Sequence, residues 1–308
     1  MERKTLLIFD TNSIIHRAFH ALPPLKDKKG RISGAVYGSL STFFRIVNEI
    51  NPSFVAVAFD SPGKTFRHKE YKEYKANRPK CPDELVEQLI RTKDLFREMG
   101  IEVLSREGLE ADDIVGAVSR LTEDNIETII VTGDMDILQL VNKKTKAYTL
   151  KRGIKESVLY NIEKVKEKYD GIAPDKIPDI KALQGDKSDN IPGVTGVGEK
   201  TAIKIIKEFD SIENLYNKLK KDDCNILSSS LKEKLLQEEK MAFLSKRLAT
   251  INTGDFNNFT VEKFYFSVEN TKAEEIIKEL GFFSLLKWFS KKEKSAKKEE
   301  KKNLIFDF

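Results

Sequence analysis

Three short apolar runs in this sequence each lead into an aspartate. LLIF runs into Asp10, FVAVAF into Asp60 and TIIVTG into Asp134. Continuous Val, Ile, Leu and Phe runs of this length are typical of strands that are buried on both faces of a parallel sheet. Such sheets bind ligands at the carboxyl ends of their strands. We therefore expect a mostly parallel α/β sheet whose edge brings the three carboxylates together.

Further acidic residues accompany these strand ends. Asp136 follows Asp134 by two residues, and the clusters 110–113 and 186–189 each lie beside a predicted helix boundary. A single aspartate at such a place is most simply a helix cap or a partner of the helix macrodipole. Many carboxylates in one cleft raise each other's pKa, so together they indicate bound cations, and oxygen ligands favour magnesium or manganese. The nine candidate metal ligands are Asp10, Asp60, Glu110, Asp112, Asp113, Asp134, Asp136, Asp186 and Asp189.

Helical patterns alternate with these strands in the first half of the chain. A turn-rich stretch with Pro23, Pro24 and Gly30 follows the first strand, and residues 61–80 lack a sustained apolar period, so they are expected to be irregular. The remaining expected elements are helices over 36–50, 82–100 and 114–121 and a strand over 101–104. This βαβ order predicts a sheet flanked by helices.

The pattern changes from about Lys146. A hairpin is expected over 146–160, followed by a series of short helices. A strand-like stretch over 259–268 and a helix over 273–281 then lead to the apolar 282–289, which should pack against the body of the protein.

Charge is distributed unevenly. The chain has a net charge of +5, and residues 287–302 alone account for it, because they carry eight Lys against three Glu. In the remaining chain, residues 64–80 hold seven Lys and Arg against Glu70 and Glu73. The sequence thus combines an acidic rim with a separate basic segment.

The two cysteines, Cys81 and Cys224, lie outside any metal-ligand spacing. This usage fits a reducing cytosol and disfavours a zinc site or a disulfide framework. The apolar stretch at the start is too short for a signal peptide, and no run approaches transmembrane length. We expect a soluble cytoplasmic protein without membrane contact.

Within the basic segment, residues 66–78 interleave Lys and Arg with aromatic side chains. Bases stack on aromatic rings while cations meet phosphates, although a solvated charged helix explains the segment equally well by itself. Beside a carboxylate cleft the nucleic-acid interpretation is favoured, because a phosphate needs cations to approach such a rim. Lys75 and Arg78 are the candidates for contacting the scissile phosphate, and Arg67, Tyr71 and Tyr74 are further candidate DNA contacts.

A glycine-rich hairpin over 191–209 is the third candidate element. Glycines let the backbone approach a phosphate, and the following helix offers free N–H groups. No strand precedes it, which excludes a dinucleotide-binding fingerprint. A tight turn between helices is the simpler alternative, but a helix-hairpin-helix that grips duplex backbone fits better. Its candidate DNA-binding residues are Gly193, Gly196, Gly198, Lys200 and Thr201.

In order along the chain stand DTNSIIHRAF, FD, FRHKEYKEYKANR, GLEADD, TGDMD and GDKSDNIPGVTGVGEKTA. Together they strongly resemble the bacterial 5′ nuclease family, which includes the amino-terminal domain of DNA polymerase I, its stand-alone exonuclease relatives and the flap endonucleases. The resemblance covers about residues 5 to 290.

The resemblance implies a PIN-like nuclease that cleaves DNA at 5′ flaps, nicks and recessed 5′ ends with two divalent metal ions, Mg²⁺ or Mn²⁺. It implies that the hairpin binds duplex backbone, around a K⁺ held by carbonyls. Lys75 and Arg78 match the basic positions of a helical gateway for the free 5′ end. The first metal set would be Asp10, Asp60, Glu110, Asp112 and Asp113, and the second Asp134, Asp136, Asp186 and Asp189.

Three regions are expected on this basis. Residues 1–170 would form the PIN-like domain with its gateway at about 61–95, and 171–290 the helix-hairpin-helix region. Residues 291–308 would be a flexible Lys/Glu-rich tail. Its end, Asn303–Phe308, resembles a sliding-clamp-binding peptide with Asn in place of the usual leading Gln, and is equally explained as a boundary where a polymerase would continue.

The resulting hypothesis is metal-assisted hydrolysis of DNA in primer removal and repair. Two alternatives stay open: a PIN-type ribonuclease, and a non-catalytic protein that binds DNA junctions. A phosphatase with Asp10 as nucleophile is disfavoured, because the sequence Asp10-Thr-Asn lacks a second aspartate two residues later.

Overall fold

The structure is a computed structural model that describes residues 4–121, 125–150, 157–224, 226–254 and 260–289. The tail expected over 291–308, with the Asn303–Phe308 end, lies outside the described residues. In the described part of the chain, no helix combines the length and the apolar character needed to span a bilayer.

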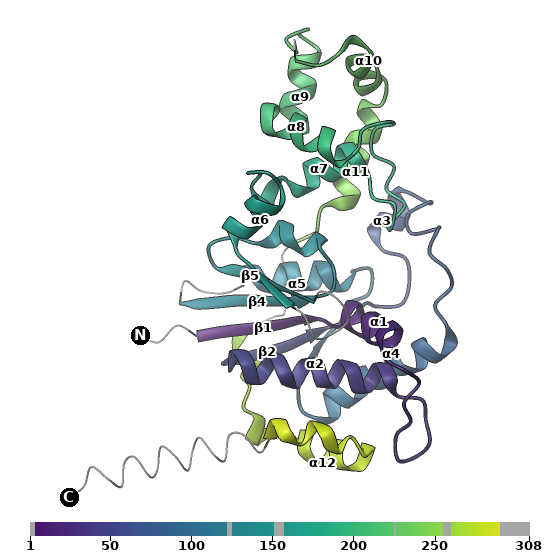
Figure 1. Cartoon of the computed structure of the whole chain (residues 1–308), viewed down its shortest axis with the longest axis vertical. Coiled ribbons are helices and arrows are strands. Elements are labelled where there is room, and N and C mark those ends of the chain that lie inside the picture. The colour runs from purple at the N-terminus through teal and green to yellow at the C-terminus, as the bar shows by residue number, and fades with distance from the viewer. Residues whose placement is uncertain (1–3, 122–124, 151–156, 225, 255–259, 290–308) are drawn as a thin grey trace, which may run out of the picture.

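A mostly parallel sheet forms the centre of the molecule (Figure 1), as predicted. Its six strands in the described residues are β1 (Lys4–Asp10), β2 (Phe54–Ala58), β3 (Glu102–Leu104), β4 (Ile126–Thr132), β5 (Thr145–Leu150) and β6 (Ser157–Tyr160). They are ordered β3-β2-β1-β4-β5-β6, and β6 runs antiparallel to β5. Alternate residues of β1 enter two cores: Leu6 and Ile8 lie in one, Leu7 and Phe9 in the other.

Helices cover both faces of the sheet. The core that contains Phe9 is closed by α1 (Thr11–Ala21), α2 (Gly34–Ile50) and α4 (Asp83–Glu98). The core that contains Ile8 is closed by α5 (Ala111–Arg120), η1 (Asp136–Leu140) and α6 (Ile162–Lys168). A short helix, α3 (Phe66–Glu70), precedes turns in the segment that was expected to be irregular.

The helix α1 was not predicted, because Thr-Asn-Ser after a strand end is typical of a turn. The carboxylate of Asp10 accepts a hydrogen bond from the backbone N–H of Ser13 at 3.4 Å and so caps the helix. Ile14, Ile15 and Ala18 then face the core. The first strand therefore passes directly into a helix that borders the carboxyl edge of the sheet.

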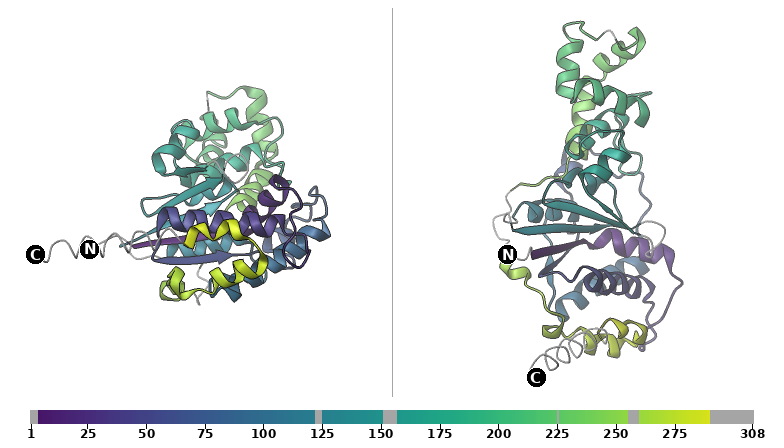
Figure 2. Two further views of the ribbon diagram at one scale, coloured as in Figure 1. Left: turned by 60° about the horizontal axis from the view of Figure 1, so that its bottom comes forward. Right: turned by 60° about the vertical axis from the view of Figure 1, so that its left-hand side comes forward.

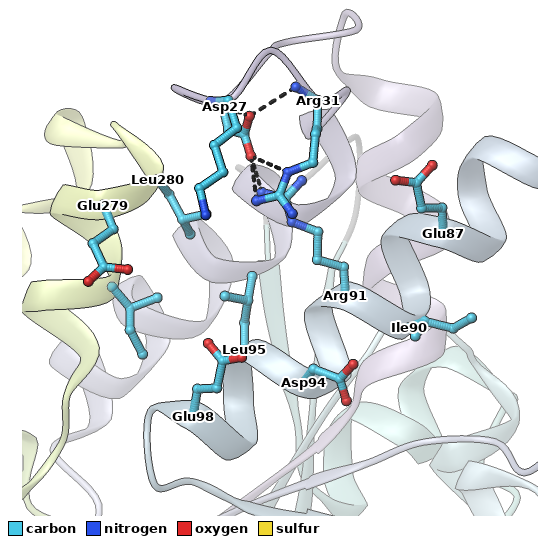
Figure 3. Close-up of a pocket in the computed structure, with 12 residues that line it drawn as sticks. Asp27, Arg31, Glu87, Ile90, Arg91, Asp94, Leu95, Glu98, Glu279 and Leu280 are labelled. Atoms are coloured by element: carbon cyan, nitrogen blue, oxygen red, sulfur yellow. Dashed lines mark hydrogen bonds and ion pairs between the residues drawn. The ribbon is translucent and has the colours of Figure 1, made fainter.

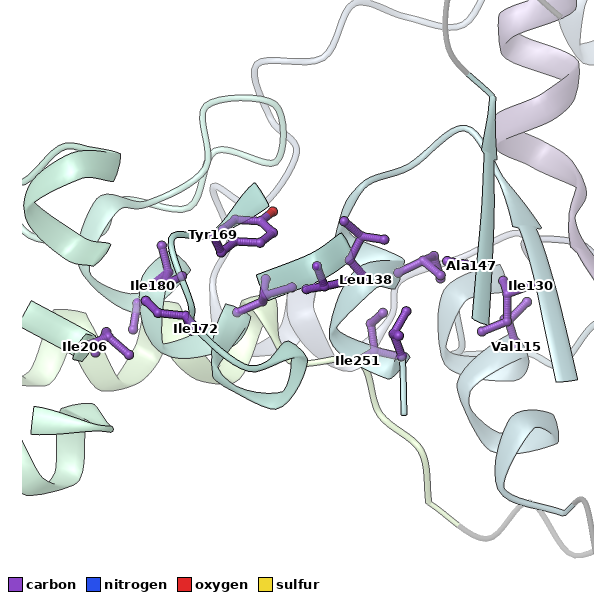
Figure 4. Close-up of a cluster of buried hydrophobic side chains, with 14 of the residues drawn as sticks. Val115, Ile130, Leu138, Ala147, Tyr169, Ile172, Ile180, Ile206 and Ile251 are labelled. Carbon is purple, nitrogen blue, oxygen red and sulfur yellow. The ribbon is translucent and has the colours of Figure 1, made fainter. Parts of the chain in front are cut away.

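A helical lobe stands at one end of the molecule (Figures 1 and 2). It comprises η2 (Pro174–Lys176), α7 (Ile177–Gln184), α8 (Glu199–Phe209), α9 (Ile212–Leu219), α10 (Ser229–Gln237) and α11 (Glu239–Ala249). One apolar core runs without interruption from Ile130 in the sheet through Leu138 and Ile180 to Ile206 in the lobe (Figure 4). Continuous burial of this kind joins the lobe firmly to the sheet.

The C-terminal segment returns to the sheet. It contains η3 (Val261–Phe264), η4 (Val268–Asn270), α12 (Ala273–Leu280) and η5 (Phe283–Leu285). Ile277 and Phe282 pack in the same core as α2, and α12 lies at the end of the molecule opposite the helical lobe (Figure 2, right). The segment from α12 to η5 therefore packs against the sheet and not within the helical lobe.

The strand predicted over 259–268 is also corrected. The described part of this stretch forms the 3₁₀ helix η3 and the start of η4, and only an isolated bridge joins Tyr265 to Phe54 of β2. The outer edge of β2 is already paired with β3 from Ala56 to Ala58. The apolar pattern is that of a strand, but β3 occupies most of the edge that a strand would need.

Candidate active site

The order of the strands places β2, β1 and β4 side by side, with their carboxyl ends at one edge. Asp10 ends β1, Asp60 lies just beyond β2, and Asp134 lies just beyond β4. A cavity of about 670 Å³, called the cleft below, opens at this edge. Eight of the nine predicted acids line it, namely Asp10, Asp60, Glu110, Asp112, Asp134, Asp136, Asp186 and Asp189.

Neutral donors hold the acids at the sheet edge. Thr132 donates its hydroxyl to Asp10 at 2.7 Å, and Asp60 accepts from the backbone N–H of Ala111 at 2.7 Å and from the amide of Asn12 at 2.8 Å. Burial raises the pKa of Asp10 to about 6, and it also raises the pKa values of Asp60 and Asp112. These carboxylates are thus held in place while burial disfavours their charge.

The basic segment closes one side of the cleft. The Nζ of Lys75 lies 2.9 Å from Glu110 Oε2 and 3.9 Å from Asp189 Oδ2, and Arg78 forms an ion pair with Asp189. Lys75 has a left-handed φ of 56°, and its backbone N–H donates to the carbonyl of Asp189 at 2.9 Å. The hydroxyl of Tyr74 lies 3.1 Å from Glu110 Oε2 and 3.0 Å from Asp189 Oδ2. Tyr74 is 3% exposed and therefore positions carboxylates instead of stacking on a base as expected.

A lysine that was not predicted holds the opposite side. The Nζ of Lys181, on α7, lies 2.6 Å from Asp136 Oδ1 and also contacts Asp186 Oδ2. Burial and the neighbouring Asp134 raise the pKa of Asp136 to about 7. Burial has the same tendency at Asp186, but the hydrogen bond and positive charge of Lys181 and the hydrogen bonds from Ser188 together outweigh it, so the pKa of that carboxyl is lowered.

Arg67 and Asp113 lie behind the cleft, which corrects the expectation for both. Arg67 donates to the two carboxylate oxygens of Asp113 at 2.9 and 2.8 Å and to the carbonyls of Leu248 and Thr250 at 2.9 and 3.1 Å. Arg67 is 1% exposed and Asp113 is fully buried. Successive helical residues are turned by about 100°, so Asp112 can face the cleft while Asp113 faces away from it. Arg67 is too buried to contact DNA.

The glycine-rich hairpin joins α7 to α8 and contains two kinds of glycine. Gly193 has a φ of 67°, and a Cβ there would lie 2.2 Å from the backbone nitrogen of Gly185, so this glycine permits a close backbone approach. Gly193 is buried, whereas Gly196, Gly198 and Lys200 are exposed at the start of α8. Thr201, in the first turn of α8, is half-buried.

The hairpin is continuous with part of the acidic rim. The backbones of Asp186 and Ile191 exchange two N–H to carbonyl hydrogen bonds of 2.8 Å, which close the turn that carries Asp189. The backbone N–H of Gly193 then donates to the hydroxyl of Ser245 at 3.0 Å. One rigid segment therefore carries both the last two acids and the exposed hairpin.

Family models match nearly all of the folded chain. The model described as 5′-3′ exonuclease, N-terminal resolvase-like domain, matches residues 5–170, and the model described as 5′-3′ exonuclease, C-terminal SAM fold, matches residues 172–274. The chain belongs to the 5′-3′ exonuclease family.

Individual relatives agree with this assignment. The chain is 41% identical over 305 residues to DNA polymerase I of Bacillus subtilis and 39% identical over 299 residues to that of Caldicellulosiruptor bescii, and the two matches cover 98% and 92% of this chain. It spans 34% of the length of each of these relatives. The fold is similar to that of the D15 flap endonuclease of bacteriophage T5, solved with DNA and metal ions, at a TM-score of 0.65 and 20% identity, over 94% of this chain and 97% of that one.

Sequence reasoning missed further residues of this family member that line the cleft. Asn12, Ser13, His16, Arg17 and His20 all come from α1. Their spacing of three and four residues was a usable signal once a helix had been placed directly after Asp10. Lys181 had a weaker signal, because only its position five residues before Asp186 connects it with the acids.

A second cavity, of about 420 Å³, lies between α4 and α12 (Figure 3). Asp27 accepts from the backbone N–H groups of Lys29 and Arg31, both at 2.9 Å, and it also pairs with the guanidinium groups of Arg31 and Arg91. These contacts fasten the loop before α2 to α4. None of the predicted acids lines this cavity.

The donor set of the cleft fits a hard divalent cation, because it consists of carboxylate oxygens. In the part of the chain that the structure describes, no three acidic, His or Cys side chains are arranged as a ready metal-binding group. Lys75, Arg78 and Lys181 hold several of the carboxylates instead.

Proposed function

We propose that this chain is a metal-dependent nuclease that hydrolyses DNA at 5′ flaps, nicks and recessed 5′ ends. The observation that carries the proposal is one cleft of about 670 Å³ in which eight carboxylates meet Lys75, Arg78 and Lys181. Membership of the 5′-3′ exonuclease family supports it. The T5 relative of similar fold, which is a flap endonuclease solved with DNA and metal ions, supports the substrate class.

Two divalent cations would be held by the acids of the cleft. Bound Mg²⁺ or Mn²⁺ supplies an acidified water and stabilises charge on the phosphate. Asp113 is not included, because it is buried against Arg67. The proposed ligands are Asp10, Asp60, Glu110 and Asp112 for one cation, and Asp134, Asp136, Asp186 and Asp189 for the other.

Lys75 and Arg78 would bind the scissile phosphate. The Arg78 side chain is 50% exposed and that of Lys75 22% exposed, and both cations already face the acids of the cleft. A phosphate that enters beside Glu110 and Asp189 would meet these cations with little movement of the backbone. Tyr74 would keep both carboxylates oriented through its hydroxyl.

Duplex DNA would be bound by the exposed part of the hairpin. Gly196 and Gly198 leave the backbone accessible, and the first turn of α8, with Lys200 and Thr201, offers N–H groups and positive charge. We also propose a K⁺ ion at the hairpin carbonyls. Gly193 would contribute by packing against Gly185.

Cleavage of a 5′-labelled single-flap DNA tests the function. We expect products in Mg²⁺ and none in EDTA, and we expect Asp134→Asn to lose activity. Asp170→Asn is the matched control, because Asp170 pairs with Lys207 on the exposed surface of the lobe. Flap binding without cleavage in either condition would identify a non-catalytic junction-binding protein. Faster cleavage of an RNA flap than of a DNA flap would identify a ribonuclease.

The end of the chain carries a separate proposal. Asn303–Phe308, outside the described residues, would bind a sliding clamp. Deletion of residues 303–308 should abolish clamp binding and leave flap cleavage unchanged. An unchanged clamp affinity after deletion would end this proposal.

A further inference from the structure

We propose that Lys181 is a resident cation of the cleft, which must withdraw from Asp136 and Asp186 before a divalent cation can bind there. The inference rests on the metal centre of the proposed function. It adds a residue to that centre and a competition between the protein's own ammonium group and the metal.

The position of Lys181 is that of a bridging cation. Its Nζ contacts one carboxylate from η1, at 2.6 Å from Asp136 Oδ1, and another, that of Asp186, from the loop after α7. The two acids lie fifty residues apart in the sequence, and the ammonium group joins them across the cleft wall. A divalent cation shared by these carboxylates would need the same place.

The other oxygen of Asp186, and one oxygen of the neighbouring Asp134, are less available. Asp186 Oδ1 accepts from the backbone N–H and the hydroxyl of Ser188, both at 2.7 Å. Asp134 Oδ1 accepts from the backbone N–H of Asp136 at 2.9 Å. These short-range donors keep the carboxylates oriented, so the oxygen of Asp186 that remains for a cation is the one that Lys181 holds.

Lys181 is able to leave without unfolding the site. Its ammonium is a compact charge on a flexible four-carbon stem, and its side chain retains 13% exposure in a cleft that is open to solvent. Its withdrawal would expose two negative carboxylates, which is unfavourable unless a cation arrives. The lysine therefore balances the charge of Asp136 and Asp186 and raises the threshold for metal binding.

Calorimetric titration of the full chain with Mn²⁺, without DNA, tests the proposal. In Lys181→Met we expect the dissociation constant of the affected site to fall about tenfold, because the metal no longer competes with a charge in contact with its ligands. In Lys181→Arg we expect it to rise about tenfold, because the planar guanidinium holds two carboxylates more firmly. The midpoint of thermal unfolding in EDTA should fall in Lys181→Met and stay near that of the unaltered chain in Lys181→Arg.

Lys176→Met is the matched control, since Lys176 pairs with Asp210 at 2.6 Å outside the cleft, and Mn²⁺ affinity should not change. Unchanged or weaker Mn²⁺ binding by Lys181→Met would overturn the proposal, because it would make the lysine an organiser of the carboxylates. If Lys181→Met does not fold, the Lys181→Arg variant decides. An Mn²⁺ affinity of Lys181→Arg equal to or above that of the unaltered chain would also overturn the proposal. Absence of Mn²⁺ binding by the unaltered chain would instead contradict the proposed metal centre, and this inference with it.

Discussion

Two contacts between a carboxylate and a cation, one behind the cleft and one in it, differ in burial and in the other partners of the cation. Behind the cleft, Arg67 and Asp113 have side chains that are 2% and 0% exposed. In the cleft, the side chains of Lys181 and Asp136 are 13% and 24% exposed. Arg67 also donates to two backbone carbonyls of the helical lobe and, at 3.4 Å, to Glu110 Oε2, whereas the hydrogen bonds and ion pairs of the Lys181 ammonium within the described residues go to carboxylates only.

The difference shows how a structural ion pair can be told from an exchangeable one. A buried pair whose cation is also bonded to backbone carbonyls cannot open without leaving a charge uncompensated, whereas a flexible ammonium beside solvent can move away. The Arg67 pair joins α3, α5 and the end of α11. The Lys181 pair holds a site that another cation can occupy.

The largest effect on stability should come from Arg67→Met. We expect it to lower the free energy of unfolding by about 3–5 kcal/mol, because it leaves Asp113 buried without a counter-charge. Chemical denaturation monitored by circular dichroism measures the change. The control is Arg247→Met. Arg247 forms an ion pair with Glu70 at the surface, and its side chain is 70% exposed, so the free energy of unfolding should change by no more than about 0.5 kcal/mol. Equal losses of unfolding free energy in Arg67→Met and Arg247→Met would mean that the buried ion pair is no more important for stability than the surface pair.

Adjacent aspartates on the two sides of the rim should respond differently. Asp112→Asn should lower flap cleavage on the order of 10²–10³-fold, the usual cost of losing one group that supports transition-state charge, because a proposed ligand of the metal centre is lost. Its free energy of unfolding should change little or rise, because burial disfavours the charge of this carboxylate and raises its pKa. Asp113→Asn should destabilise the fold and keep most of the cleavage rate per folded molecule. Steady-state cleavage rates, corrected for the folded fraction, distinguish the two variants. Equal rates for Asp112→Asn and Asp113→Asn would mean that the two aspartates do not differ in their relation to the cleft.

Metal binding should stabilise the cleft without depending on the pair behind it. Mn²⁺ at a hundred times its dissociation constant should raise the free energy of unfolding by about 2.7 kcal/mol. The same increment is expected in Arg67→Lys, which retains the charge near Asp113, and a smaller one in Asp186→Asn. Denaturation in Mn²⁺ and in EDTA gives the increment for each variant. Loss of the increment in Arg67→Lys would show that the two contacts act as one unit.

The smallest effect should come from a neutral donor at the sheet edge. Asn12→Ala removes the amide that donates to Asp60 at 2.8 Å and should weaken Mn²⁺ binding about tenfold. Asn48→Ala is the control, because Asn48 donates to the carbonyl of Phe44 within α2, away from the acids. Calorimetry that finds equal affinities in the two variants would mean that Asp60 needs no such support.

The architecture and most of the acidic rim followed from local patterns. Buried apolar runs specify parallel strands, and parallel strands bring their final residues to one edge, which is why the order of residues alone placed Asp10, Asp60 and Asp134 together. Lys75 was also correctly placed beside the acids, because phosphate chemistry demands cations there. The helix α1 was missed, because its first residues have the composition of a turn.

What the sequence by itself determined was the parallel sheet, its edge and the crowd of carboxylates along it. Only the tertiary structure decided which of two adjacent aspartates faces the cleft, because that depends on the rotation of α5 against the sheet. It also decided that Arg67 is buried, through carbonyls that lie more than 180 residues away in the chain. The presence of Lys181 between Asp136 and Asp186 has the same origin, since a short-range pattern carries no information about which distant side chains share one cavity.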